Sequence, residues 1–588
     1  GIPVIKDINE TTASISVEYQ ITSQNSDGDT ELYDVKEFYR MRYLDTRIYL
    51  LDFQRSANQV FDGKLPVYSD DGIILGVRDK NVEYMMNDSA TVLAFVQEGD
   101  LWSYSPGNGK VNQVFSFRKT EDGDFRDSRI QHDIKIVRVT DAGDIDFVLY
   151  GYMNRGSHEG YEGIGVYHYN PDKNVAEERA FIPVSESFEF LKKDLEKLSY
   201  VNEENELFLL LAKSLYKINI EDNSSEVLEE GIKNANFVSS DNNDHAAWLV
   251  SEGDEKGNIK EINFDTGETR LIEHEKGKRL RAVGFMNEDL IYGILNKSDI
   301  LTDEDGHKSE GISILRIEDF DGNVKKEYQK DGLYITDISV GSTLIEFELS
   351  AKSGDTSYVA QKKDNIMNNK KATENTVKIE LVSASRTGVR VKLALNGTAQ
   401  TDSPLTMYAK VSSTNQKDIV LDTQIPQEST YYVYGQGGLD SIYTDPAKAI
   451  LQADALGGVV LNRAQQYIWE RGNKKTKTQM DTAELPEAIL AGTMDIKTLK
   501  KSVKKTGTVI DLTGCSLDSV LYEVSAQRPV IAKTGSDTSV VIVGYDEYNT
   551  YLYDPVKKET YPYGMNDSTD LFQKAGNVFI TYVESVSY

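Results

Sequence analysis

Few residues in this chain could carry covalent chemistry, and their positions limit what they can do. Cys515 is the single cysteine, and the six histidines are His132, His158, His168, His245, His274 and His307. A cysteine nucleophile needs a base close to it in the fold, most often a histidine. Because no histidine follows His307, the last part of the chain cannot build a Cys–His pair of its own. One cysteine also excludes an intrachain disulfide and a cysteine-based zinc cluster.

The most specific pattern lies near the C-terminus, in RPVIAKTGSDTSVVIVGYDEYNTYLYDP, residues 528–555. Two apolar runs flank a polar turn, and Tyr-Asp-Pro ends a third run, so we expect three strands here. The preceding SLDSVLYEV predicts a helix, because Leu517, Val520, Leu521 and Val524 share one face at helical spacing. Helix-like runs from about residue 445 onward complete the pattern of an α+β domain.

Residues 445–583 resemble the papain-like family of bacteriocin-leader-processing peptidases. The resemblance implies a cysteine nucleophile, a histidine base, an acidic residue that orients the histidine, and a glutamine that donates to the oxyanion. Position by position, Asp554 fits the acidic residue and Thr538 stands where the histidine belongs. The nucleophile position, at the start of a helix expected over LNRAQQYIWERG, falls at Gly458 or Val459, and Gln452 lies where the glutamine belongs.

Two of the three catalytic groups that the resemblance implies are therefore absent. Cys515 precedes a different helix, and we interpret it as a small buried apolar side chain. Thr538 reads as a β-former, and Asp554 as a residue that caps a turn. We predict an inactive peptidase-like domain, a pseudopeptidase, whose groove binds an extended peptide or docks a partner by strand addition. A purely structural module is the alternative.

A different pattern fills the first two thirds of the chain. A strand followed by a hairpin with an Asx/Gly turn recurs five times, in LWSYSPGNGKVNQVFSF, GVYHYNPDKNVAEERAFI, LYKINIEDNSSEVLEEG, IKEINFDTGETRLIEHE and ILRIEDFDGNVKKEYQK. Successive units start roughly 45–65 residues apart, as the blades of a β-propeller do. The order of strands and turns in residues 239–270 resembles TolB-like and WD-repeat-like propellers. Weaker units in the first 60 residues and over about residues 342–425 would bring the number of blades to seven or eight; a β-sandwich is the alternative.

Charge and short motifs narrow the choice of partners. The net charge is −30, of which residues 440–588, with 16 basic and 19 acidic side chains, contribute only −3. Such an acidic chain is repelled by phosphate backbones, so we expect no nucleic acid partner. Acidic turns at 121–124, 303–306 and 319–322 resemble fragments of calcium loops, but none has the complete ligand set. We expect no metal and no cofactor.

The remaining features concern the surface and the address of the protein. Lysines 497, 500, 501, 504 and 505 form one face of an amphipathic helix, which we interpret as a solvated face. No run of about 18 apolar residues predicts a transmembrane helix, although a signal or anchor removed before Gly1 is compatible with the sequence. The low cysteine content and the acidic, Tyr- and Asn-rich composition fit an extracellular or envelope-associated protein of a Gram-positive-like bacterium.

Together these features predict a mainly β propeller of seven or eight blades at 1–436, followed by an α+β papain-like cysteine-peptidase-like domain at 437–588. We expect a non-catalytic binding or scaffold protein that offers a ligand platform and a site for a peptide or protein partner. One alternative is a hydrolase in the propeller channel, which needs two histidines or several carboxylates to converge at one mouth. The other is a purely structural ectodomain of an envelope assembly. The oligomeric state stays open.

Overall fold

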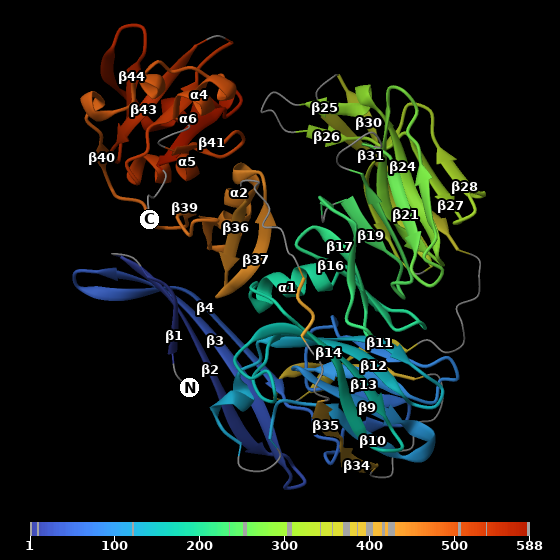
Figure 1. The fold of residues 1–588 in the computed structure, drawn as a ribbon. Helices are drawn as coiled ribbons and strands as arrows, with labels where there is room; N and C mark the ends of the chain where they lie inside the picture. Colours follow the sequence, from blue (N-terminus) through green and yellow to red (C-terminus); the bar gives the residue numbers. More distant parts are fainter. Residues whose placement is uncertain are drawn as a thin grey trace.

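The computed structural model describes most of the chain, in segments separated by short gaps. The described residues are 3–8, 11–119, 123–233, 236–250, 256–302, 308–341, 343–354, 357–368, 377–384, 386–395, 404–413, 418–421, 430–503, 507–536 and 538–584. An N-terminal sheet, a series of packed sheets and a C-terminal unit follow one another along the chain, and Figure 1 shows all three.

Seven sheets between residues 68 and 413 account for most of the strands in the described residues. In order, they contain β5 (Tyr68–Ser69), β6 (Gly72–Ile74), β32 (Lys378–Ala384) and β33 (Gly388–Ala394); β7 (Tyr84–Met86), β8 (Leu93–Gln97), β9 (Asp100–Ser105), β10 (Lys110–Phe115) and β34 (Leu405–Tyr408); β11 (His132–Val139), β12 (Ile145–Tyr152), β13 (Glu162–Asn170), β14 (Val175–Pro183) and β35 (Lys410–Ser413); β15 (Ser199–Val201), β16 (Glu206–Leu211), β17 (Ser214–Asn219) and β18 (Ser225–Glu229); β19 (Phe237–Ser239), β20 (His245–Leu249), β21 (Ile259–Asn263) and β22 (Thr269–Ile272); β23 (Lys278–Met286), β24 (Asp289–Asn296), β27 (Ile314–Glu318) and β28 (Val324–Gln329); and β29 (Tyr334–Val340), β30 (Leu344–Ser353) and β31 (Ser357–Met367).

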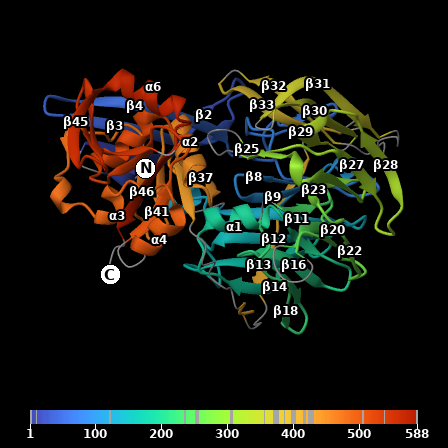
Figure 2. The ribbon, with the colours of Figure 1, turned by 90° about the horizontal axis from the view of Figure 1, so that it is seen from above.

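Buried apolar side chains pack each of these sheets face to face on the next. Six clusters join the seven sheets in sequence order, from Ile73 and Leu393 in the first pair to Ile345 and Phe347 in the last. The first strands of several neighbouring sheets also touch, as β7, β11 and β15 do. Figure 2, seen from above, shows the sheets following one another around an arc. The arrangement is propeller-like, and all five hairpins read from the sequence are confirmed as paired strands.

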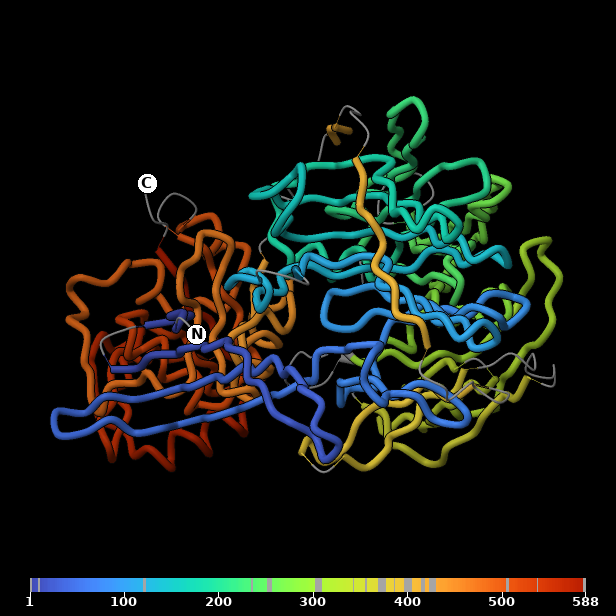
Figure 3. The backbone as a smooth tube through the Cα atoms, turned by 90° about the horizontal axis from the view of Figure 1, so that it is seen from below, coloured from blue at the N-terminus to red at the C-terminus, as the bar shows by residue number. Residues whose placement is uncertain are grey.

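The first sheet of the series joins strands from the two ends of the packed sheets. β6 pairs with β33, so strands about 320 residues apart in the chain lie side by side. Further along, β34 adds to β10 and β35 adds to β14, both in parallel register, so residues 405–413 cross the outer edges of two sheets. Figure 3 shows this segment crossing the molecule. Helix α1 (Phe188–Leu195), which the sequence reading did not anticipate, lies between β14 and β15.

The first 60 residues do not form a blade. They form a separate antiparallel sheet, the N-terminal sheet, from β1 (Pro3–Ile8), β2 (Thr12–Gln24), β3 (Thr30–Leu44) and β4 (Arg47–Gln59). The expectation of a propeller unit here is wrong, because in the described part of the chain β2, β3 and β4 pair only with one another and β1, and one face of the sheet packs on the C-terminal unit. Alternating apolar and polar residues predicted the strands correctly but not the surface on which they pack.

The C-terminal unit contains two sheets and several helices. Its strands are β36 (Tyr431–Gly435), β37 (Gly438–Tyr443), β38 (Val459–Asn462) and β39 (Tyr467–Glu470) in the smaller sheet, and β40 (Thr478–Gln479), β41 (Gly507–Asp511), β42 (Val530–Lys533), β43 (Ser539–Tyr545), β44 (Asn549–Asp554), β45 (Glu559–Gly564) and β46 (Phe579–Glu584) in the larger. The α-helices are α2 (Pro446–Leu456), α3 (Glu487–Leu490), α4 (Ile496–Val503), α5 (Leu517–Ser525) and α6 (Met565–Lys574). Within the described residues, no helix has both the length and the apolar content needed to cross a membrane.

The segment after α2 in this unit forms strands. The helix expected over LNRAQQYIWERG is wrong: the segment is a hairpin of β38 and β39, whose turn places Gln465 at φ 59° and closes with Asn462 N–H donating to the Gln466 carbonyl. The pairs Val459–Val460 and Ile468–Trp469 fill the core from both strands. In addition, β36 pairs with β37 and β38, so the division predicted at residue 436 passes through a hairpin.

Candidate functional site

The residues carried over from the peptidase resemblance lie in two separate places in the C-terminal unit. Gln452 is on α2 and its side chain donates to Asp440, while Gly458 and Val459 lead from α2 into β38. Thr538 precedes β43, and Asp554 ends β44, its neighbour in the larger sheet. Among the described residues, no hydrogen bond or ion pair joins the first group to the second.

Neither position proposed for the nucleophile has room for a reactive side chain. A Cβ atom on Gly458 would lie 2.1 Å from the Tyr434 carbonyl oxygen, so a side chain there would push β36 and β38 apart. Val459 is buried in the strand that pairs with Tyr434 and Glu470. Both residues therefore serve the packing of the smaller sheet.

The other two positions also have local partners. The exposed Thr538 accepts a hydrogen bond from the Thr534 hydroxyl, and its carbonyl accepts from the Thr534 N–H. The Asp554 carboxylate accepts from the backbone N–H groups of Val556 and Lys557, and these bonds lower its pKa. Asp554 thus caps the turn after β44.

Cys515 is buried in the core of the C-terminal unit. Its thiol has no solvent exposure and lies 4.0 Å from the Ala447 carbonyl oxygen at the start of α2. Burial raises the pKa of the Cys515 thiol to about 12, which keeps it protonated at neutral pH. A thiol in this state is a weak nucleophile, and it packs as a small apolar group.

The lysine helix and the acidic turns have ordinary local roles where the structure describes them. α4 buries Leu499 and Val503, so its amphipathic character is confirmed; Lys504 and Lys505 lie outside the described residues. In the turn at 319–322, Asp319 pairs with Lys325 at 2.6 Å. Asp124 pairs with two arginines, whereas residues 121, 122 and 303–306 lie outside the described segments. In the described part of the chain, no cluster of three metal-ligating side chains occurs.

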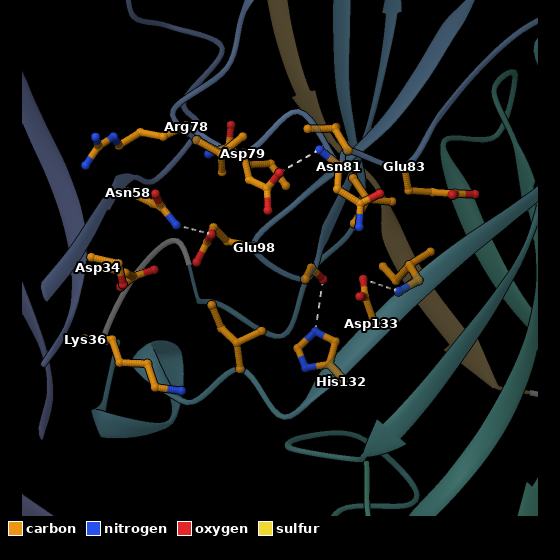
Figure 4. Close-up of a pocket in the computed structure, with 18 of the residues that line it drawn as sticks. Asp34, Lys36, Asn58, Arg78, Asp79, Asn81, Glu83, Glu98, His132 and Asp133 are labelled. Atoms are coloured by element: carbon orange, nitrogen blue, oxygen red, sulfur yellow. Dashed lines mark hydrogen bonds between the residues drawn. The ribbon is translucent and has the colours of Figure 1, made fainter. Parts of the chain in front are cut away.

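A large cavity lies where the N-terminal sheet meets the packed sheets. It has a volume of about 1020 Å³ and is lined from four directions: by β2, β3 and β4, by the segment leading into β7, by the β8–β9 turn with the start of β11, and by α1. Figure 4 shows Asp34, Lys36 and Asn58 of the N-terminal sheet on one side and His132 and Asp133 of β11 on the other, with Glu98 between them. We call this space the junction cavity.

Glu98 occupies a strained position at this cavity. Gln97 pairs with Asp100, so Glu98 and Gly99 form a two-residue hairpin loop, with φ of 51° and 78° respectively. Such loops favour asparagine and glycine, because other side chains rarely adopt positive φ. The Glu98 carboxylate accepts a hydrogen bond of 2.7 Å from the Asn58 side chain, and burial raises the pKa of Glu98. Strain at a carboxylate that faces a cavity favours a functional role.

His132 is packed against the same loop. Its Nε2 atom lies 3.0 Å from the Gly99 carbonyl oxygen, and a Cβ on residue 99 would lie 2.6 Å from this nitrogen. The side chain is almost fully buried, Nδ1 has no hydrogen-bond partner, and burial lowers the pKa of His132 to about 4. His132 is therefore neutral at pH 7. Position 99 requires glycine, because any larger residue would clash with the His132 ring.

Most of the charges around the cavity are already paired with one another. Lys192 pairs with Asp133 at 2.7 Å, Lys135 pairs with Glu83 at 3.1 Å, and Lys36 lies 3.7 Å from Glu18. Glu98 and Asp79 are the lining carboxylates without an ion pair in the described residues, and the exposed Arg78 is a lining cation without one. Of these carboxylates, only Glu98 is largely buried.

A buried network fastens the two halves of the cavity together. The Arg118 guanidinium donates to Asp34 of β3 at 2.8 Å and to Asp100 of β9 at 3.1 Å. Burial raises the pKa of Asp100 to about 6, although Arg118 and the Ser116 hydroxyl oppose the shift. A second contact joins the same two parts: the Gln97 side chain donates to the Gln59 backbone carbonyl at 2.6 Å. The N-terminal sheet is thereby fixed relative to the Glu98 loop.

Sequence reasoning did not find this cavity. The only local signal is the dipeptide Glu98-Gly99 at a two-residue turn, where Asn-Gly or Asp-Gly would be expected. The partners Asp34 and Asn58 come from a sheet that the sequence reading placed in a propeller blade, so their convergence on Glu98 was not foreseen.

No protein-family model and no curated protein matches this chain. Similar solved structures include a putative C39-like peptidase from Bacillus anthracis (23% identity, 16% of this chain and 58% of that chain, TM-score 0.14) and TolB from Acinetobacter baumannii (10%, 46% and 81%, 0.18). Another is the β-propeller domain of the Trilobed protease from Pyrococcus furiosus (9%, 63% and 100%, 0.24).

These likenesses are distant. The chain spans less than two thirds of the length of the Bacillus anthracis protein, and every TM-score is below 0.5. The neighbours include TolB-like and peptidase propellers, but the description of the fold rests on the strand pairing and packing given above.

Proposed function

We propose that this chain is a non-catalytic binding protein that holds an amine-bearing peptide in the junction cavity. The observation that carries the proposal is Glu98, a largely buried carboxylate with one side-chain hydrogen-bond donor, Asn58, and no ion pair within the described residues, although the nearby Arg118 partly offsets its charge. A carboxylate desolvated in this way gains most from a ligand that supplies a positive charge. The positive φ of Glu98 adds a conformational cost that a binding role would explain.

The other charges of the cavity favour a ligand with both donors and acceptors. Lys192, Lys135 and Lys36 are neutralised by carboxylates of the wall, whereas Arg78 keeps a guanidinium free to meet a carbonyl or carboxylate. A peptide offers an amine, backbone N–H groups and carbonyl oxygens on one molecule. The volume of about 1020 Å³ is at the upper end of the range of ligand pockets, roughly 300–1,000 Å³, and fits a segment of a few residues.

Several observations favour binding over hydrolysis at this site. Among the described histidines, His132 alone lines the cavity, and its lowered pKa of about 4 and buried Nδ1 make it a poor base. The rival hydrolase hypothesis keeps some support, since seven carboxylates line the cavity and burial raises the pKa of Glu83 and Glu98. A turnover assay on the peptides described below separates the two.

The finer features of the fold belong to the same proposal. We take the seven packed sheets as seven blades and the C-terminal unit as an inactive papain-like module that docks a partner. The buried Cys515 and the closed surroundings of Gly458 support inactivity. We place the protein outside the cell or at the envelope, where peptides from other proteins are accessible; an envelope scaffold without a small ligand is the alternative.

The test is titration calorimetry with the pentapeptide Gly-Lys-Gly-Lys-Gly and with the same peptide carrying acetylated amines. We expect binding of the free-amine peptide only, and at least a tenfold weaker association for Glu98→Gln. Asp79→Asn is the matched control, because Asp79 lines the cavity without an ion pair but is exposed. Equal losses in the two variants would indicate general charge attraction and would contradict a specific role for Glu98.

The pH dependence gives a second readout. Burial raises the pKa of Glu98, so its carboxyl begins to take up a proton at a higher pH than an exposed glutamate does. Pairing with an amine requires the ionised form. Binding therefore weakens as pH falls through the raised pKa of Glu98, and proton release on binding is measurable there in buffers of different ionisation enthalpy. An affinity that stays constant until exposed glutamates take up protons would contradict the pairing.

A further inference from the structure

The two faces of the N-terminal sheet differ in polarity. Unlike in a usual sheet, the polar face is buried and the apolar face is exposed to solvent. The strand register assigns each side chain to a face, because residues directly opposite one another share it. One row of opposed residues is Asp7, Ser14, Arg40 and Asp52, and the adjacent row is Ile5, Ile15, Tyr39 and Phe53. The first face is polar and the second is apolar.

The polar face is the buried one. Thr12, Ser14, Ser16 and Arg40 are each at most 4% exposed, because this face lies on the smaller sheet of the C-terminal unit. The contact includes the ion pair of 3.1 Å between Arg40 and Glu470 and the hydrogen bond from the Thr12 hydroxyl to the same carboxylate. The C-terminal unit thus covers the face that water would solvate well.

The apolar face is left in water. Six of its large side chains are 40–65% exposed: Ile5, Ile8, Tyr43, Ile48, Leu50 and Phe53. Ala13, Ile15, Val17, Tyr39 and Met41 fill the space between them and are half-buried. Figure 3, seen from below, shows the strands of this sheet lying in front of the C-terminal unit, with no other part of the drawn chain over them. We call this surface the free apolar face.

The size of this face is that of an interface. The exposed parts of the six large side chains amount to on the order of 600 Å² of apolar surface. This matches or exceeds the largest patch of an ordinary monomer, and it approaches the roughly 800 Å² that each partner contributes to a stable complex. Its charged members are few and already neutralised, since Glu37 accepts from Arg55 at 2.6 Å and from two tyrosines. The face therefore recognises apolar surface rather than charge.

A bilayer is a poor occupant. β1 and β4 are both edge strands, so insertion of this face would carry two rows of backbone N–H and carbonyl groups toward hydrocarbon without partners. The net charge of −30 also opposes approach to anionic lipid. A strongly charged partner is disfavoured as well, because the face has almost no unpaired charged side chains.

We propose that the free apolar face is covered by the same face of a second copy of this chain. Interfaces between identical subunits are more apolar than those of non-obligate complexes, and a two-fold axis brings the same patch of both copies together, so that an apolar face meets an apolar face. Two antiparallel sheets pack face to face about 10 Å apart with strand directions within about 30°. In such a dimer the large side chains of both copies interdigitate and the two polar faces stay on their C-terminal units.

Charge sets the condition under which this dimer is most stable. Each copy carries −30, and their mutual repulsion is screened over about 8 Å at 0.15 M salt and over about 30 Å at 0.01 M. Association through the apolar face therefore strengthens as sodium chloride rises. Association through complementary charges would weaken instead.

The experiment is sedimentation velocity of the full chain from 1 to 100 µM in 0.02 and 0.5 M sodium chloride. We expect a species of twice the 66.0 kDa chain mass, populated at lower protein concentration in high salt. Leu50→Glu places a charge on β4 between the exposed Ile48 and Phe53 of the face and should weaken dimerisation at least tenfold. Val556→Glu is the control, because Val556 is 91% exposed on the C-terminal unit and should leave the dimer unchanged.

Circular dichroism and the melting temperature of Leu50→Glu establish that this exposed substitution leaves the fold intact. Ile48→Glu, whose side chain is 65% exposed on the same face, provides an independent second variant. A monomer at all concentrations would overturn the proposal, as would a dimer that both glutamate variants retain. Flotation of a monomeric chain with phosphatidylcholine vesicles would also overturn it and would assign the face to a lipid surface.

Discussion

Removal of the Arg40 guanidinium should loosen the attachment of the N-terminal sheet to the C-terminal unit. Arg40 and Glu470 are 5% and 1% exposed and lie 3.1 Å apart. Arg40→Ala leaves the Glu470 carboxylate buried without its cation, which costs about 3–5 kcal/mol in comparable pairs. Thr12 and Asn473 still donate to Glu470, so we expect the lower value. About 3 kcal/mol corresponds to a roughly 150-fold larger population of the separated state.

Hydrogen exchange of the β2 amides measures this population. At protein concentrations where the free apolar face is uncovered, a sheet separated from the C-terminal unit has lost its packed face and its strands open, so exchange in β2 should accelerate by about two orders of magnitude. Lys36→Ala is the control, because Lys36 and Glu18 form an exposed pair at 3.7 Å worth less than about 1 kcal/mol. Replacing both partners, as in Arg40→Met with Glu470→Leu, should cost much less than Arg40→Ala alone. Less than fivefold acceleration in Arg40→Ala would refute the reasoning.

Three further predictions concern buried groups. His132 has a pKa of about 4 when folded and about 6.5 when unfolded, so the free energy of unfolding falls by about 3 kcal/mol as pH falls from 6.5 to 4. His132→Gln should remove this pH dependence from a plot of unfolding free energy against pH. An unchanged slope in the variant would contradict the assignment. The Cys515 thiol should react with a disulfide reagent at pH 8 at least 100-fold more slowly in the folded protein than in denaturant, and similar rates would show that it is accessible. Gly458→Ala should destabilise by about 2–3 kcal/mol in chemical denaturation, whereas Gly457→Ala, with φ of 64° and open space around it, should cost about 1 kcal/mol; equal effects would exclude the clash with Tyr434 as the cause.

Local patterns predicted the strands of the packed sheets well, because hairpin turns and period-two alternation are short-range signals. They failed where two structures share one pattern. The run from Val459 to Glu470 has good helix formers, such as Arg463 and Gln466, between two apolar pairs, and this composition favours a helix. In the structure the two apolar pairs lie on adjacent antiparallel strands, and Gln465 lies in the turn that joins them. Tertiary packing decided the structure there.

The junction cavity shows a second limit. Glu98 meets Asn58, and Arg118 meets Asp34, across sequence separations of 40 and 84 residues. Nothing in the sequence around Asp34 and Asn58 indicates that these residues belong to a separate sheet that contacts the packed sheets at the junction cavity. The absence of a histidine beyond His307 was, by contrast, readable from the sequence alone, because it depends on composition and not on packing.

The polar face of the N-terminal sheet has a consequence for the way the chain must be made. Arg40 emerges from the ribosome about 430 residues before Glu470, and synthesis at about 5–20 residues per second leaves it without its partner for roughly 20–90 s. β6 likewise waits for β33. During this interval the N-terminal sheet exposes Arg40, which is buried in the folded chain, on one face and isoleucines on the other. The first 60 residues therefore lack the surface on which they pack until the last quarter of the chain has been made.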